Sequence, residues 1–176
     1  MKVAESWMYK DKLKNRKQIN NLLISDLLNK LHSDNPFEKQ HSENVSQLAM
    51  KIAMALNLNI EEIRKAKETG YFHDIGKIVL SKDVLTKPNL SSLEKQQMNQ
   101  HPVIGYRILN LFDETIDLAE GVLNHHEHWD GSGYPKGISK DNIPLIARII
   151  AVSEAYDSMV NGKKKLSKEE AIKEIV

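Results

Sequence analysis

The chain has 176 residues, with 25 basic and 24 acidic side chains and a formal net charge of +1. This length suits one domain with a substantial core, and the balanced charge argues against a protein that coats a nucleic acid polymer or adsorbs to membranes. The sequence contains no cysteine, so disulfides and thiolate metal sites are excluded and any metal must use nitrogen and oxygen ligands. No run of about 18 apolar residues occurs and the N-terminus lacks the apolar segment of a signal peptide. We therefore expect a cytoplasmic protein with no membrane segment within this chain.

Apolar residues recur at helical spacing along most of the sequence. Ser91 and Glu94 form a capping box that opens a short helix, which must stop before Pro102. Ser167 and Glu170 form a second capping box near the end of the sequence. No alternating strand pattern emerges, so the sequence predicts an all-α fold. In chain order, the predicted helices cover residues 19–31, 45–56, 60–71, 91–101, 102–111, 114–126 and 144–160.

The two ends of the chain bear on its domain organisation. The polar segment KDKLKNRKQIN, ahead of the first apolar stripe, is either a linker from an upstream sensor domain or a solvated helix start. We assign residues 1–32 to this linker and the N-terminal helix, and residues 33–176 to the main domain. The stripe of Leu22, Leu23, Leu27 and Leu31 would either pair with a second copy in a homodimer or pack within its own domain.

Five of the seven histidines could form a metal site, although a single histidine is more often a surface or core residue. His73 is followed by Asp74, whose two oxygens can bridge two cations about 3.5–4 Å apart. His125 and His126 are adjacent, and neighbouring side chains on a helix point about 100° apart, so packing alone rarely requires both. Gly76 and Lys77 also suit an ordinary helix C-terminus, but that interpretation leaves the histidines unexplained.

Four segments in order resemble the HD-GYP family, a branch of the HD-domain metal-dependent phosphohydrolases. They are HDIGK (73–77), HPVIGYRIL (101–109), HHEHWDGSGYP (125–135) and IPLIARIIAVSEAYD (143–157). His41 stands where the family keeps its first histidine, and the match covers residues 33 to 160. The resemblance implies a compact helical bundle of about seven or eight helices with a central metal site. It also implies an enzyme that hydrolyses cyclic di-GMP to linear pGpG, to GMP or to both.

The resemblance further implies a role for each site residue. One metal would be held by His41, His73, Asp74 and Glu154, and a second by Asp74, His101, His125 and His126. Lys77 would contact the scissile phosphate or the bridging water, and Asp157 would support a ligand or handle a proton. Substrate would be bound by Tyr134 and Gly133 of the GYP motif and by Lys163 and Lys164.

The implied chemistry follows from charge. Two cations would lower the pKa of a bridging water and stabilise the phosphoryl oxygens. The resulting hydroxide would attack in line and displace the ribose 3′ oxygen, with Lys77 adding positive charge. Nitrogen and carboxylate ligands suit iron or manganese, and the resemblance favours these two metals.

Three departures from the family pattern bear on activity. Glu154 replaces the usual aspartate and displaces its carboxylate by about 1.5 Å unless the rotamer compensates. Phe37 stands where three-metal members carry glutamate, and Glu38 is offset by one residue, so no third metal is expected. The basic stretch after Asp157 is shortened, and Lys163, Lys164 and Lys165 either replace its cations or form a solvated loop. The alternatives are a degenerate module that binds nucleotide or a protein partner, and a hydrolase of another nucleotide.

Overall fold

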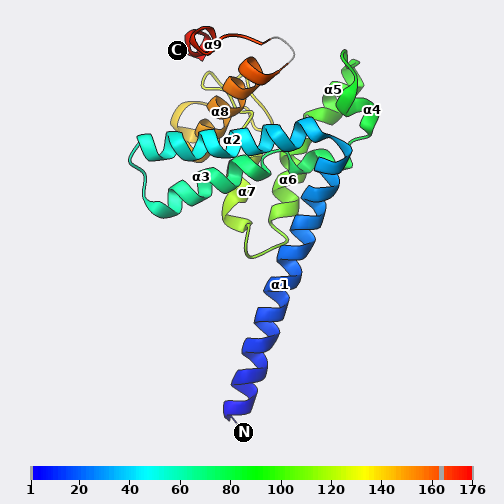
Figure 1. Ribbon diagram of the computed structural model, residues 1–176, viewed down its shortest axis with the longest axis vertical. Coiled ribbons are helices and arrows are strands. Elements are labelled where there is room, and N and C mark those ends of the chain that lie inside the picture. The colour runs from blue at the N-terminus through cyan, green and yellow to red at the C-terminus, as the bar shows by residue number, and fades with distance from the viewer. Residues whose placement is uncertain (1, 163–164, 176) are drawn as a thin grey trace.

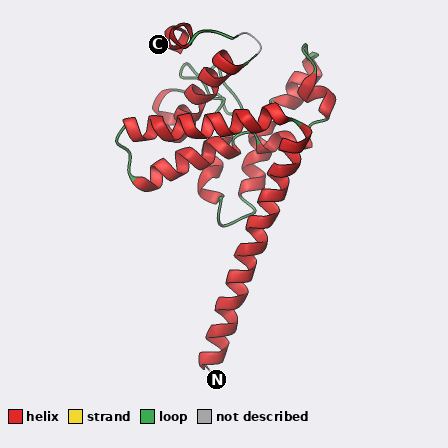
Figure 2. Cartoon of the chain, viewed as in Figure 1, coloured by secondary structure: helices red, strands yellow, loops and turns green. Residues whose placement is uncertain are grey.

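The computed structural model describes residues 2–162 and 165–175, with the side chains of 2–11, 13 and 34 outside that description. Helices dominate this part of the chain and no strand occurs within it (Figure 2). The all-α prediction is therefore confirmed. None of the described helices is long and apolar enough to span a bilayer.

The helices follow one another with short connections. In chain order they are α1 (Lys2–Asp34), α2 (Pro36–Ala55), α3 (Ile60–Phe72), the 3-10 helix η1 (Ile75–Val79), α4 (Lys82–Thr86), α5 (Ser92–Met98), α6 (His101–Leu109), η2 (Ile116–Leu118), α7 (Ala119–Leu123), η3 (Lys140–Asn142), α8 (Leu145–Asn161) and α9 (Lys168–Ile175).

Two apolar clusters form the core. The first lies where α2, α3 and α8 meet, and its small alanines let these helices approach closely. Its buried members are Val45, Ala49, Ala53, Ala66, Ile149 and Ile150. The second joins α1, η1, α6, η2 and α7 through Leu28, Ile75, Leu109, Leu118, Ala119 and Val122. The segment between α3 and η1 passes from one cluster to the other, so residues 73–74 lie between them.

α1 is much longer than the predicted helix over 19–31. Its first half extends away from the body of the molecule (Figure 1), and buried side chains begin only at Ile24 and continue with Leu28 and Leu31. No glycine or proline interrupts residues 1–35, so nothing in the polar segment breaks the helix. α1 ends before Asn35, which is extended (φ −144°, ψ 94°) and precedes Pro36, as proline disfavours a helical residue before it.

The segment 114–126 forms less helix than the sequence predicts. It contains η2 and the five-residue α7, which ends at Leu123. Asn124 caps this helix: its side-chain amide, at 2.7 Å, and its backbone N–H, at 3.2 Å, both donate to the Glu120 carbonyl. The chain then turns, and the Glu127 N–H donates to the Asn124 carbonyl at 3.0 Å. His125 and His126 consequently lie in a turn beyond the helix, and both rings reach the centre described below.

Both predicted capping boxes are present. The Ser91 and Glu94 box opens α5. Glu170 Oε2 accepts hydrogen bonds from Ser167 at the start of α9, where Ala171 is fully buried. α4 was not predicted, because it is only one turn long and depends on a Ser81 cap.

Candidate metal centre

A tight turn after α3 places His73 and Asp74 in the interior. α3 is capped by His73, and η1 begins at Ile75, so Gly76 is not the cap of α3. A side chain at Gly76 would bring its Cβ within 2.0 Å of the His101 carbonyl oxygen and 2.6 Å of the Gly105 nitrogen. Only glycine permits this approach, which brings the turn against the start of α6 and places Asp74 beside His101.

The first cluster of possible ligands consists of His41, His73 and Asp74, whose ligand atoms all lie within 4.8 Å of one another. Asp74 Oδ2 lies 3.1 Å from His73 Nε2 and 3.9 Å from His41 Nε2. His73 Nδ1 donates to the Gly70 carbonyl at 2.9 Å, which fixes the ring and points Nε2 at the carboxylate. These three residues are brought together from α2 and from the turn after α3.

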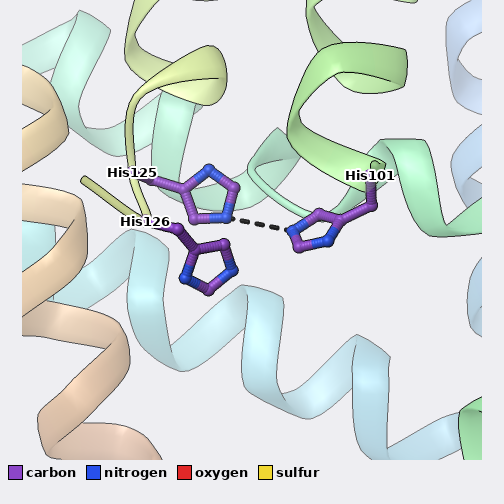
Figure 3. Close-up of side chains that lie close together, drawn as sticks. All are labelled: His101, His125 and His126. Carbon is purple, nitrogen blue, oxygen red and sulfur yellow. Dashed lines mark hydrogen bonds between the residues drawn. The ribbon is translucent and has the colours of Figure 1, made fainter. Parts of the chain in front are cut away.

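The second cluster consists of His101, His125 and His126, again within 4.8 Å of one another. Figure 3 shows the three imidazoles converging from α6 and from the turn after α7. His101 Nδ1 lies 2.8 Å from the Met98 carbonyl, and His125 Nδ1 lies 2.5 Å from the Val122 carbonyl. A carbonyl only accepts, so a neutral ring carries its proton on Nδ1 in both residues.

This tautomer has a direct consequence for the 3.2 Å contact between the Nε2 atoms of His101 and His125. With both protons on Nδ1, two lone pairs face each other, an unfavourable arrangement unless a cation lies beside them. Burial lowers the pKa of His125 well below its usual value, and it lowers that of His126 to about 4. Both rings are therefore neutral near pH 7, the state that a metal requires.

Asp74 connects the two clusters. Its Oδ2 faces His73 and His41, while Oδ1 lies 3.1 Å from His101 Nε2. Both Asp74 Oδ1 and His73 Nε2 are buried and make no hydrogen bond. Burial would raise the pKa of Asp74, but the positive charges of His73 and Lys77 hold it well below its usual range. An ionised carboxylate that faces both clusters, beside a buried histidine nitrogen without a hydrogen bond, suits a pair of divalent cations.

Lys77 lies beside this carboxylate. Its Nζ donates to Asp74 Oδ2 at 2.5 Å and to Glu38 Oε1 at 3.0 Å. Burial opposes its charge, but the carboxylates of Asp74 and Glu38 outweigh this effect and raise the pKa of Lys77. The predicted catalytic lysine thus lies next to Asp74, where it adds positive charge.

Glu38 is a residue of this site to which the sequence assigned no role. It is buried, and burial together with the nearby Asp74 raises its pKa to about 7. Phe37, in contrast, is 87% exposed. The available signal was spacing, because Glu38 and His41 lie three residues apart and so share one face of α2.

Asp157 is hydrogen-bonded to His41, a residue of the first cluster. Its Oδ2 accepts a hydrogen bond from His41 Nδ1 at 2.7 Å, and its Oδ1 accepts from the amides of Asn44 and Asn161. Hydrogen bonds from carboxylates fix the tautomer and orientation of metal-bound histidines. This arrangement favours the support role that the resemblance implied over direct proton transfer.

Glu154 lies at the edge of the centre. Its Oε2 is 3.9 Å from His126 Nδ1, and it belongs to neither of the two compact clusters. Metal ligation by Glu154 stays a prediction.

Tyr134 covers the second cluster. Its ring stacks on that of His126, with centroids 4.8 Å apart and an interplanar angle of 23°. Its backbone N–H donates to the His126 carbonyl at 3.1 Å. Gly133 packs so closely that an added Cβ would lie 2.3 Å from the His128 nitrogen, so its evident role is close packing, and substrate contact by Gly133 stays a prediction.

The loop after Tyr134 is held by Glu127, to which the sequence assigned no role. Its Oε1 accepts hydrogen bonds from the backbone nitrogens of Lys136 at 2.7 Å and Gly137 at 3.2 Å. The side chain is buried, although it belongs to a residue type that is seldom buried. Lys163 and Lys164 lie outside the described residues, so their substrate role also stays a prediction.

Comparisons relate this chain to known proteins. The sequence model of the HD domain family matches residues 26–176. The chain is 36% identical over 159 residues to the cyclic di-GMP phosphodiesterase of Thermotoga maritima, covering 86% of this chain and 43% of that protein. It is 32% identical over 139 residues to the 3'3'-cGAMP-specific phosphodiesterase 1 of Vibrio cholerae, covering 78% of this chain and 32% of that protein. The chain thus spans less than half the length of either relative.

A similar solved structure is that of a cyclic GMP-AMP specific phosphodiesterase of Vibrio cholerae. It has a TM-score of 0.64 and 22% sequence identity, and the match covers 87% of this chain and 43% of that chain. At this identity the likeness shows a shared helical fold.

Proposed function

Because the chain belongs to the HD domain family, and to its HD-GYP branch, we propose that it is a metal-dependent phosphodiesterase that hydrolyses a cyclic dinucleotide. Cyclic di-GMP is the proposed substrate, with linear pGpG, GMP or both as products. The observation that carries the proposal is Asp74, whose two oxygens face two separate clusters of imidazole nitrogens. The names of the relatives, which refer to cyclic di-GMP and to 3'3'-cGAMP, support the substrate class.

The proposed cofactors are two divalent transition metal ions, with iron or manganese favoured by the nitrogen and oxygen ligands. His41, His73 and Asp74 would hold one ion, with Glu154 as a further proposed ligand. Asp74, His101, His125 and His126 would hold the other. Bound together, such ions lower the pKa of a bridging water and neutralise charge on a phosphodiester.

The side chains of the protein prepare this chemistry. Asp74 stays ionised and is held by Lys77, whose ammonium adds positive charge where the anionic phosphodiester must approach. Asp157 keeps the proton of His41 on Nδ1, so that Nε2 is available as a ligand. Tyr134 covers His126 and limits access of water to that side of the centre.

The test is metal analysis of the purified protein, followed by hydrolysis of cyclic di-GMP with added Mn²⁺ or Fe²⁺. We expect about two metal ions per chain and turnover that Asp74→Ala abolishes while the helical circular dichroism spectrum is retained. A protein that retains no transition metal would refute the proposal.

A second candidate function is a binding module that has lost turnover. The position of Glu154 Oε2, 3.9 Å from His126 Nδ1 and outside both clusters, favours this alternative. Two bound metals with no hydrolysis of any cyclic dinucleotide would select it. Hydrolysis of a different nucleotide would instead identify another substrate for the same centre.

We also propose that residues 1–32 connect the domain at 33–176 to partners, as a homodimer contact and as the link to an upstream sensor. Ile19, Leu22 and Leu23 support the first proposal, because these apolar side chains are exposed on α1. Sedimentation of the wild type against Leu22→Glu tests it, and a monomeric wild type would contradict it. The cytoplasm is the proposed location, which cell fractionation tests.

A further inference from the structure

A pocket of about 460 Å³ lies between α5 and the GYP loop, next to the metal centre. One wall carries Lys95, Gln96, Asn99 and Gln100, and the other carries Tyr134 and Pro135. This size falls within the range of about 300–1,000 Å³ that is typical of small-molecule sites. Tyr134 belongs both to this pocket and to the metal centre, where its ring stacks on His126.

Both walls are attached to proposed metal ligands. The Met98 carbonyl at the end of α5 accepts the His101 Nδ1 hydrogen bond at 2.8 Å, and Gln100 directly precedes His101. Opposite, the Tyr134 N–H donates to the His126 carbonyl. The pocket is therefore fixed in position relative to the metal centre. When the phosphate of a nucleotide binds at that centre, the group attached to the phosphate lies at a set distance from the pocket walls.

The pocket also has the right chemistry for a base. Its lining offers three side-chain amides, one ammonium group, the Ser92 hydroxyl and the tyrosine ring of Tyr134, and no carboxylate. Amides present both donors and acceptors, and aromatic rings stack on bases. Lys95, Gln96, Asn99 and Gln100 follow helical spacing, so one face of α5 and the turn after it carries all four.

Two other cavities suit a nucleotide less well. The groove of about 610 Å³ between α1 and α3 carries four carboxylates (Glu68, Asp113, Glu114 and Asp117) against two cations (Lys17 and Arg64), so its lining has a net negative charge that disfavours an anion. The cavity of about 270 Å³ beside α9 is almost entirely apolar, with Leu48, Ile52 and Ile172 in its lining.

Building on the proposed function, we propose that the pocket between α5 and Tyr134 holds one nucleobase of the cyclic dinucleotide and selects guanine over adenine through Lys95. Lysine donates well to the O6 and N7 acceptors of guanine, whereas adenine presents an amino donor at the position of O6. Tyr134 stacks on the base, and Gln96 binds its edge. Relatives named for cyclic di-GMP and for 3'3'-cGAMP share the family, so base choice must depend on groups beyond the phosphate-binding centre.

The experiment compares Lys95→Gln and Gln96→Ala with two control variants. Gln97→Ala lies on the same helix but lines a different cavity, and Lys82→Gln removes an exposed lysine of α4. The readout is the dissociation constant of the manganese-loaded protein for non-hydrolysable phosphorothioate analogues of cyclic di-GMP and cyclic di-AMP. Metal content and kcat/KM for cyclic di-GMP are measured in parallel.

We expect Lys95→Gln to reduce the preference for guanine by about tenfold, since one good contact to a base edge contributes on that order. Gln96→Ala should weaken the binding of both analogues several-fold. Both control variants should bind the analogues as the wild type does, with unchanged metal content. Variants at 95 and 96 that bind both analogues as the wild type does would overturn the base pocket, even if hydrolysis is normal. Loss of binding in these variants, in a protein without hydrolysis, would support the pocket and refute the hydrolase. A wild type that binds neither analogue would overturn the pocket as well.

Discussion

Replacing Asp157 with asparagine should weaken metal binding by His41, although it removes none of the proposed ligands. Asp157 Oδ2 accepts from His41 Nδ1 at 2.7 Å, and Oδ1 accepts from Asn44 at 2.8 Å and from Asn161 at 2.7 Å. Each of these partners donates to a carboxylate oxygen, and an amide offers only one oxygen. If the amide NH₂ faces His41, the imidazole proton must move to Nε2, which blocks the lone pair that faces Asp74. If the NH₂ instead faces Asn44 and Asn161, three amide donors meet without an acceptor.

The magnitude follows from these two orientations. Loss of an outer partner of a metal-bound histidine typically lowers metal affinity about 10–100-fold, and moving the proton to Nε2 puts the effect near the upper end of that range. A buried donor left without a partner costs about 1–3 kcal/mol of folding free energy. The fold therefore survives, and the change is expressed mainly in metal retention at the first cluster.

The assay is dialysis of both proteins against buffered Mn²⁺, followed by metal analysis, with nitrogen NMR of the His41 ring in the metal-free state. Asn161→Ala is the matched control, since it removes one donor to Asp157 and leaves the His41 bond intact, so its metal affinity should stay within about threefold of the wild type. The reasoning fails if Asp157→Asn keeps wild-type metal affinity with the His41 proton still on Nδ1.

Three further predictions follow from the same centre. Burial opposes the charge of His73, but Asp74 raises the pKa of His73 from 6.5 to about 9. The protonated ring therefore stabilises the metal-free fold fully below pH 6.5, and this stabilisation is lost as the pH rises through about 9. Between pH 6.5 and about 9 the Tm of the metal-free protein should fall while its affinity for Mn²⁺ rises, because a proton and the cation compete for His73 Nε2. A Mn²⁺ affinity that does not change with pH would contradict this prediction. Lys77→Met should lower kcat by about 10²–10³-fold with both metals retained, as measured by steady-state kinetics; metal loss equal to the activity loss would assign Lys77 a purely structural role. Glu127→Ala should raise the KM for cyclic di-GMP more than it lowers kcat, because the loop after Tyr134 loses its acceptor, whereas Glu127→Gln, which keeps one oxygen, should restore most of the affinity; a pure loss of thermal stability in both would refute a positioning role.

The helices that are confirmed are those whose signal is local. The capping boxes at Ser91 and Ser167 depend on residues three apart, and both are present. Apolar spacing likewise located α2, α3 and α8. α7 is shorter than predicted because the chain turns after Asn124, the cap of α7, and brings His125 to His101. That turn depends on contacts between distant segments, which periodicity does not report.

The residues of the candidate site also divide into those that a sequence signal selects and those that only their contacts in the structure reveal. The resemblance selected Asp74 and five histidines, and the structure brings all six side chains together, while their roles as ligands remain predictions. Glu38 and Glu127 were not assigned roles, because their importance lies in what each touches: the Lys77 ammonium for Glu38, and two loop N–H groups for Glu127. A buried carboxylate becomes recognisable only once its partners are known.

α1 extends far beyond the rest of the domain (Figure 1). At 1.5 Å per residue its 33 residues span about 50 Å, and the end nearest the domain packs against η1, which carries Lys77, and continues after Asn35 into α2, which carries Glu38 and His41. A tilt or twist applied at the outer end would be transmitted as a lever to both elements at once. Movement of the outer end of α1 would thus reach the helix η1 that carries the lysine, and a point less than about two helical turns from the first histidine.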